Sequence, residues 1–243
     1  MYKKLLLFFI FLASSIFSEA KKDHVVCIHG FMGSSWNMHL FKKNLRKDGW
    51  DSVSWKYPSR DRFIREHAKE LVSYLTSLVK DKPDQPIHFV AHSMGGLVLL
   101  AALNDPSCPY EAKIGKVILL APPLKGSYWG RWAGRFSLTR WITKQFSGHE
   151  LITKTSFDDL GKYPSSLEGV LVIAGSLGFN PLLKEKNDGT LAISETSLST
   201  PHKHVVIKRG HKTIIFSKKA YGLIYQFLKR SPQSELNCNC NKN

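Results

Sequence analysis

The chain has 243 residues, of which 35 are lysine or arginine and 19 are aspartate or glutamate, so its formal net charge at pH 7 is +16. This length suits one α/β domain with a sizeable core. The basic residues are spread along the chain with no nucleic-acid-binding motif among them. The charge therefore favours an anionic membrane surface over nucleic acid as a partner.

The first twenty residues have the pattern of a cleavable secretory signal peptide. A basic start at residues 1–4 precedes an almost unbroken apolar run over residues 5–17, and Ser18 and Ala20 are the small residues that a signal peptidase requires. The run is too short to span a membrane comfortably, which counts against an uncleaved anchor. We therefore predict that residues 1–20 are removed and that the protein is secreted or periplasmic. Because two lysines and one glutamate leave with them, the mature net charge is +15.

The mature chain alternates short apolar runs with longer helical patterns, which predicts one domain over residues 21–230 and a polar tail over residues 231–243. Continuous apolar strands between helices are typical of a parallel sheet that is covered on both faces. The predicted fold class is therefore α/β, with an about six-stranded, mostly parallel sheet. The predicted strands are residues 24–28, 51–57, 87–91, 116–121, 169–174 and 204–208, and the predicted helices are residues 34–48, 64–79, 94–104 and 213–229.

Residues 124–165 interrupt this alternation with a long insertion. Aromatic residues such as Trp132 and Trp141 are interleaved there with basic ones such as Arg131 and Arg135. One interpretation is a structural helical insertion whose aromatic side chains join the core. The other is a lid or interfacial element, apolar on one side and basic on the other, that covers a site.

The segment around Ser93 has the pattern of a nucleophilic serine. The predicted strand that ends at Ala91 and the helix that begins after Ser93 place this serine on a sharp turn, where its hydroxyl is exposed. Such a turn needs small neighbours, and Ala91, Gly95 and Gly96 supply them. The usual pattern is G-x-S-x-G, so Ala91 departs from it by one methyl group. The alternative is a glycine-rich turn that merely opens a core helix.

A second glycine-containing turn follows the first predicted strand. His29, Gly30 and Phe31 come directly after it, and glycine there lets backbone N–H groups point into a cavity above the sheet. The N–H groups of Phe31 and Met94 are the predicted oxyanion hole. His29 and His92 are expected to shape these two turns rather than to act as a base.

The candidate acid and base follow the last two predicted strands. Asp188 lies in the loop after residues 169–174, and His211 lies directly before the final helix. Ser93, Asp188 and His211 thus occur in the chain order of one known Ser-Asp-His triad architecture. Taken alone, the Asn-Asp-Gly sequence around Asp188 is an ordinary turn.

Together these segments resemble the small bacterial lipases and esterases of the α/β-hydrolase superfamily. The resemblance implies that Ser93 attacks an acyl carbonyl, that His211 carries the proton and that Asp188 orients His211. It also implies a sheet that lacks the first two strands of larger hydrolases. The matching segments are His-Gly-Phe at 29–31, Ala-His-Ser-Met-Gly-Gly at 91–96, Ala-Pro-Pro at 121–123, Asn-Asp-Gly-Thr at 187–190 and Gly-His at 210–211.

The predicted function is an exported serine hydrolase that cleaves carboxylic esters, with a preference for lipid acyl esters inferred from the insertion and the net charge. No metal or organic cofactor is expected. Thioester hydrolysis or acyl transfer by the same residues is an alternative, and a catalytically silent, membrane-associated binding protein is another. The sequence does not determine the oligomeric state.

Four cysteines remain to be placed. Cys27 lies in an apolar run and is expected to be a buried, inert thiol. Cys108, Cys238 and Cys240 lie in polar segments, and export would permit disulfide bonds among them. The sequence does not choose among the pairings.

Overall fold

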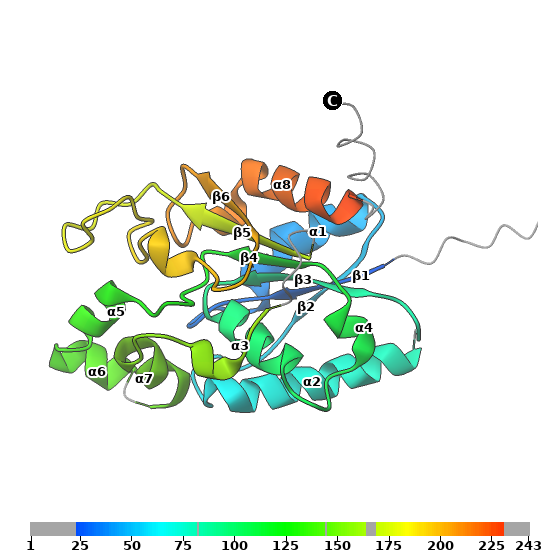
Figure 1. Cartoon of the computed structure of the whole chain (residues 1–243), viewed down its shortest axis with the longest axis horizontal. Coiled ribbons are helices and arrows are strands. Elements are labelled where there is room, and N and C mark those ends of the chain that lie inside the picture. The colour runs from blue at the N-terminus through cyan, green and yellow to red at the C-terminus, as the bar shows by residue number, and fades with distance from the viewer. Residues whose placement is uncertain (1–22, 82, 144, 164–168, 231–243) are drawn as a thin grey trace, which may run out of the picture.

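The computed structural model describes residues 23–81, 83–143, 145–163 and 169–230, and its centre is a six-stranded sheet (Figure 1). The strand order is β2-β1-β3-β4-β5-β6, and every neighbouring pair is parallel. The predicted α/β fold class and all six predicted strands are confirmed. The strands are β1 (His24–Ile28), β2 (Asp51–Trp55), β3 (Ile87–His92), β4 (Val117–Leu120), β5 (Val170–Gly175) and β6 (Lys203–Ile207).

The burial of each strand explains its place in the sheet. Every residue of β1, β3, β4 and β5 is buried, whereas the edge strands β2 and β6 are only partly buried. A strand that packs against helices on both faces buries side chains on both, so these strands are mostly apolar and do not alternate between apolar and polar residues. Successive side chains of β1 enter different clusters, since Val25 packs in one and Val26 in the other.

Helices cover both faces of the sheet (Figure 1). One face packs against α2 (Ile64–Asp81), α3 (Met94–Leu103) and the short α4 (Tyr110–Lys113). The opposite face packs against α1 (His39–Lys47) and α8 (Lys218–Lys229). Two of the predicted helices begin as separate 3-10 turns, η1 (Ser35–Met38) before α1 and η4 (Ile214–Phe216) before α8.

The insertion forms three short helices, α5 (Tyr128–Ala133), α6 (Ser137–Thr143) and α7 (Phe146–Thr153). Of these, α7 contacts α2, and α5 and α6 pack against α7. Two further 3-10 turns, η2 (Asp158–Leu160) and η3 (Ser194–Thr196), lie on either side of β5 in the chain. Phe136, Leu138 and Trp141 are exposed and belong to neither hydrophobic cluster. Phe136, between α5 and α6, and Leu138 and Trp141, in α6, therefore do not extend the core. In the described ranges, no helix has the length and apolarity needed to cross a membrane.

The cysteines are placed only in part. Cys27 is buried, as predicted, and burial raises the pKa of its thiol to about 12. Cys108 is also buried, within a turn between α3 and α4, and among the described cysteines it forms no disulfide bond. It belongs to the same hydrophobic cluster as Ala112 of α4. The predicted signal peptide, Cys238 and Cys240 lie outside the described residues.

A matched pair of glycines tests this packing. A Cβ atom on Gly115 would lie 1.7 Å from the carbonyl oxygen of Ile87 in β3, whereas one on Gly222 in α8 would meet no neighbouring atom within 4 Å. We expect Gly115→Ala to lower the free energy of unfolding by about 3 kcal/mol, because strand backbone must move. Gly222→Ala should raise it by about 0.5–1 kcal/mol, because alanine favours a helix interior. Urea unfolding measures both changes. If Gly115→Ala left the free energy of unfolding unchanged, the close approach of Gly115 to the β3 backbone would be contradicted.

Candidate active site

Ser93 occupies a strained turn between β3 and α3. Its backbone φ of 50° and ψ of −125° lie where a residue with a side chain is disfavoured. The Ser93 N–H donates to the carbonyl oxygen of Leu120 in β4, 2.9 Å away, which fixes the turn against the sheet. A Cβ on Gly95 would lie 2.5 Å from the carbonyl oxygen of His29, so only glycine allows this approach. Ala91 is buried within β3, and the turn accommodates its methyl group.

Ser93, His211 and Asp188 form one continuous chain of hydrogen bonds. Ser93 Oγ lies 3.0 Å from His211 Nε2, and His211 Nδ1 lies 2.7 Å from Asp188 Oδ2. Because a carboxylate only accepts, the Nδ1 atom carries the proton and Nε2 presents a lone pair to the serine hydroxyl. This arrangement allows the imidazole to take the serine proton during nucleophilic attack.

Asp188 lies in the loop after β5, at the carboxyl end of the parallel strands, and the backbone of this loop fixes its side chain. Its side chain is buried, and its second oxygen, Oδ1, accepts from the N–H groups of Thr190 at 2.9 Å and Leu191 at 2.7 Å. The His211 N–H donates to the Asp188 carbonyl oxygen at 2.9 Å, which joins the two loops. A Cβ on Gly175, the last residue of β5, would lie 2.8 Å from the Asp188 Cβ, so this glycine allows the acid to approach the sheet.

The turn after β1 lies directly beside the serine. A Cβ on Gly30 would lie 3.0 Å from the Ser93 Cβ atom, and the Gly33 N–H closes the turn on the Gly30 carbonyl oxygen at 3.0 Å. Within the described residues, neither the Phe31 N–H nor the Met94 N–H donates to a backbone carbonyl oxygen in the turns and loops. Their positions, one on each turn, suit a pair of donors for an oxyanion.

Two buried histidines support these turns. The His29 ring stacks on Tyr57 with 4.3 Å between ring centroids, and the Tyr57 hydroxyl donates to the His29 carbonyl oxygen at 2.7 Å. The His92 Nε2–H donates to the carbonyl oxygen of His211, 3.0 Å away. Burial lowers the pKa of His92 to about 3, so its ring is neutral. His92 therefore secures the backbone of the candidate base without adding charge.

A cavity of about 560 Å³ opens above Ser93 and His211. Its volume falls within the range of small-molecule binding pockets. Apolar side chains dominate the wall, and the insertion supplies part of it. The apolar lining includes Phe31, Met32, Leu151, Ile152, Ile215 and Phe216.

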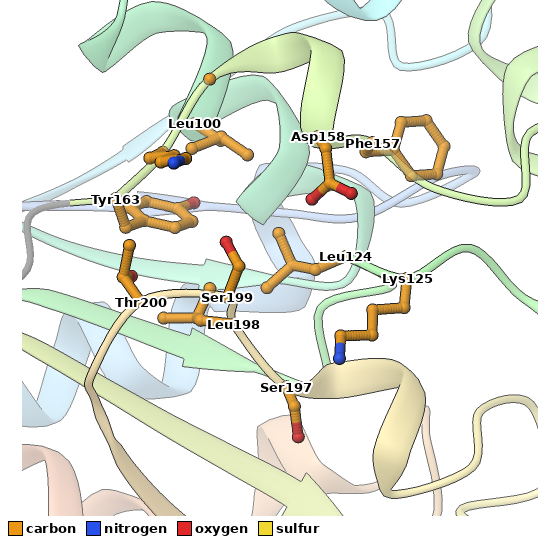
Figure 2. Close-up of a pocket in the computed structure, with 12 residues that line it drawn as sticks. Leu100, Leu124, Lys125, Phe157, Asp158, Tyr163, Ser197, Leu198, Ser199 and Thr200 are labelled. Carbon is orange, nitrogen blue, oxygen red and sulfur yellow. The ribbon is translucent and has the colours of Figure 1, made fainter.

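Figure 2 shows a second and much smaller cavity, of about 20 Å³, between Leu100, Tyr163 and the segment Ser197–Thr200. It has room for about one water molecule. Neither Ser93 nor His211 lines it. The candidate site is therefore the larger cavity.

A family model described as the alpha/beta hydrolase family matches residues 25–182, which is more than half of the chain. The chain belongs to the alpha/beta hydrolase family. The matched range includes Ser93 and the turn around Phe31, whereas Asp188 and His211 lie beyond it. Family membership supports hydrolase chemistry, and the positions of the acid and base rest on the geometry described above.

Solved hydrolase structures share the fold at low sequence identity. The mature form of Bacillus licheniformis lipase BlEst2 superposes with a TM-score of 0.65 and 17% identity, over 85% of this chain and 92% of that one. Est1E from Butyrivibrio proteoclasticus gives a TM-score of 0.59 and 16% identity, over 86% and 90% of the two chains. Phospholipase PlaB from Legionella pneumophila gives 0.66 and 13%, over 89% of this chain and 62% of that one.

The structure brings together Ser93, Asp188 and His211, which the sequence analysis selected from separate loops of this alpha/beta hydrolase. It also reveals contacts that the sequence analysis missed. The sequence near Tyr57 does not indicate its contact with His29, because the two residues lie 28 positions apart. Glu195, in η3, is a buried carboxylate whose neighbours in the sequence are polar.

The buried His92 has a measurable effect on stability. Between its ordinary pKa of 6.5 and its folded value of about 3, the unfolded chain binds a proton that the folded chain does not. The free energy of unfolding therefore falls as the pH is lowered through this window, by about 1.4 kcal/mol per pH unit for one such group. His92→Gln keeps an N–H donor and should remove that part of the slope in urea unfolding between about pH 4 and 6.

Two features control this measurement. His88, whose pKa burial lowers to about 4, retains its own part of the slope in both proteins. Above about pH 7.5 neither protein should show a contribution from residue 92, so the slopes should agree there. Identical slopes in the acid window would contradict a neutral, buried His92.

Proposed function

We propose that the protein is an exported serine hydrolase that cleaves carboxylic esters, most readily those of lipids, through an acyl-enzyme. The observation that carries the proposal is the unbroken chain of hydrogen bonds from Ser93 through His211 to Asp188, at the floor of an apolar cavity. Membership of the alpha/beta hydrolase family supports the same chemistry. The amino-terminal sequence pattern supports export.

In the first half of the reaction, Ser93 Oγ attacks the ester carbonyl carbon while His211 Nε2 takes the serine proton. The carbonyl oxygen becomes an oxyanion, and the Phe31 and Met94 N–H groups donate to it. When the intermediate collapses, the C–O bond to the alcohol breaks and His211 returns the proton to the leaving oxygen. Asp188 stabilises the imidazolium and holds the ring in position throughout.

In the second half, a water molecule attacks the acyl carbon of the ester now attached to Ser93. His211 takes a proton from this water, the bond to Ser93 Oγ breaks, and the proton passes to the serine. The products are a carboxylic acid and the free enzyme. An acceptor alcohol in place of water would give acyl transfer, and a thioester would release a thiol by the same steps.

The surroundings of the cavity support a lipid as the acyl donor. Its wall is largely apolar, and two of the apolar side chains that line it, Met32 and Phe216, are exposed to solvent. The insertion presents Leu138 and Trp141 to solvent, next to basic residues that include Arg135. With a formal net charge of +16 for the whole chain, this combination suits an anionic lipid surface.

Covalent labelling tests the nucleophile. A fluorophosphonate probe should label the wild-type protein, and Ser93→Ala should abolish both labelling and ester hydrolysis, with kcat falling at least about a thousandfold. Ser107→Ala, which alters an exposed serine after α3, is the matched control and should behave as wild type. Equal labelling of Ser93→Ala and wild type would refute the assignment. An unlabelled wild-type protein would favour the silent binding protein.

Substrate preference tests the lipid assignment. We expect kcat/KM for p-nitrophenyl esters to rise with acyl length, because each buried methylene contributes about 0.8 kcal/mol. Phosphatidylglycerol vesicles should bind the protein more tightly than phosphatidylcholine vesicles, and salt should weaken that binding. Trp141→Ser should reduce vesicle binding, whereas Tyr110→Ser, on α4 at the other end of the strands, should not; the two rings are 68% and 71% exposed. Faster turnover of short esters, or of acyl thioesters, would redirect the proposal.

A further inference from the structure

Glu195 is a buried carboxylate that lies outside the candidate cavity and outside the triad. It belongs to η3, and only 9% of its surface is exposed. Its two oxygens accept from two separate segments. Oε1 accepts from the N–H of Tyr128, the first residue of α5, at 2.5 Å, and Oε2 accepts from the N–H of Ala192 at 2.8 Å.

The Ala192 contact leads directly to Asp188. The peptide unit between Leu191 and Ala192 is held on both sides: its carbonyl oxygen accepts the Asp188 N–H at 3.0 Å, and its N–H donates to Glu195. The Leu191 N–H in turn donates to the Asp188 carboxylate at 2.7 Å. Leu191 thus contacts Asp188 through its carbonyl oxygen and through its N–H, which belongs to the preceding peptide unit, and Glu195 holds the peptide unit that follows Leu191. A displacement of the Leu191 backbone would therefore disturb both the backbone and the side-chain contacts of Asp188.

The other oxygen of Glu195 leads to the insertion. Tyr128 begins α5, and two further hydrogen bonds join the same stretch to the same loop. The Lys125 N–H donates to the Glu195 carbonyl oxygen at 3.1 Å, and Ser127 Oγ donates to the Thr190 carbonyl oxygen at 3.3 Å. Ser127 and Gly130 also line the cavity, so this stretch is part of the substrate-binding wall.

The chemistry of the carboxylate suits this bridging role. Burial raises the pKa of Glu195, while the N–H groups of Tyr128 and Ala192 and the nearby Arg131 oppose that shift. A carboxylate accepts at both oxygens, whereas an amide can accept at only one. Glutamate at this position therefore satisfies two donors that glutamine cannot satisfy together.

We propose that Glu195 is a positioning residue that couples the start of the insertion to the orientation of Asp188, and through Asp188 to His211. This inference rests on the proposed function, since it assigns a role relative to the same triad. Through Glu195, a change in the position of the start of α5 would alter the contacts of the Leu191–Ala192 peptide unit. The position of the cavity wall and the alignment of the triad are thereby linked.

Glu150 provides the matched control. From α7, at the other end of the insertion, its Oε2 accepts from the N–H of Ile64, the first residue of α2, at 2.8 Å. Glu150 thus holds the insertion in the same way as Glu195, by accepting from the first amide of a helix, but in the part of the chain that the structure describes no hydrogen bond joins it to the Asp188 loop. Glu150→Ala removes the acceptor of the Ile64 N–H. Glu195→Gln leaves an acceptor for only one of the two N–H groups that Glu195 binds.

The experiment compares full steady-state kinetics of the two variants with the wild-type protein on one soluble ester. We expect Glu195→Gln to lower kcat about tenfold and to leave KM within about twofold, because alignment of the base is lost while the cavity remains. The rate of fluorophosphonate labelling at Ser93 should fall in parallel. Glu150→Ala should lower the unfolding midpoint but keep kcat within about twofold of the wild-type value.

The outcomes separate this inference from the proposed function. An unchanged kcat in Glu195→Gln, or equal losses of kcat in the two variants, would overturn the coupling while leaving the hydrolase assignment intact. A wild-type protein that neither reacts with the probe nor hydrolyses the ester would instead overturn the proposed function. If Glu195→Gln does not fold, Ser127→Ala tests the parallel bond to Thr190, and the coupling requires a smaller loss of kcat, about threefold.

Discussion

The site depends on how closely two backbone turns approach each other at the carbonyl ends of β1 and β3. Gly95 on one turn faces the His29 carbonyl oxygen on the other, and Gly30 faces the Ser93 side chain, with no room for a Cβ at Gly95. The approach follows from the pairing of β1 with β3 in the sheet. It places the Phe31 and Met94 N–H groups beside the same serine. Sheet geometry therefore determines the position of Ser93, the candidate nucleophile, and of the two turns beside it.

The histidines around the triad differ in role because their surroundings differ. His29 and His92 are buried, which lowers the pKa of each, and each is tied to backbone carbonyl oxygens. Neutral rings there add no positive charge to a site where His211 must accept a proton. His211 alone among the three contacts both a carboxylate and the serine hydroxyl. The Asp188 contact directs its lone pair toward Ser93.

Much of this arrangement could be predicted from the sequence, because its signals are local. The strands are mostly apolar runs, and Asp188 and His211 follow the last two of them in the chain order of the predicted triad. Glu195 could not be found in this way, since Ser194, Glu195 and Thr196 have the composition of a surface turn and are buried only through tertiary contacts. The burial of Cys108 and the contact of Tyr57 with His29 could not be predicted for the same reason, because residues distant in the sequence form their surroundings.

β6 is the last of the six strands in chain order and lies at the edge of the sheet, which has a consequence for folding. Ser93 and His211 are 118 residues apart in sequence, and their contact requires that β6 has joined β5 and that the loop after it is in place. Contacts of such long sequence separation form late, because the intervening chain must first be ordered. A chain that has been synthesised only as far as β5 therefore has Ser93 but not yet His211, and the contact between them cannot form.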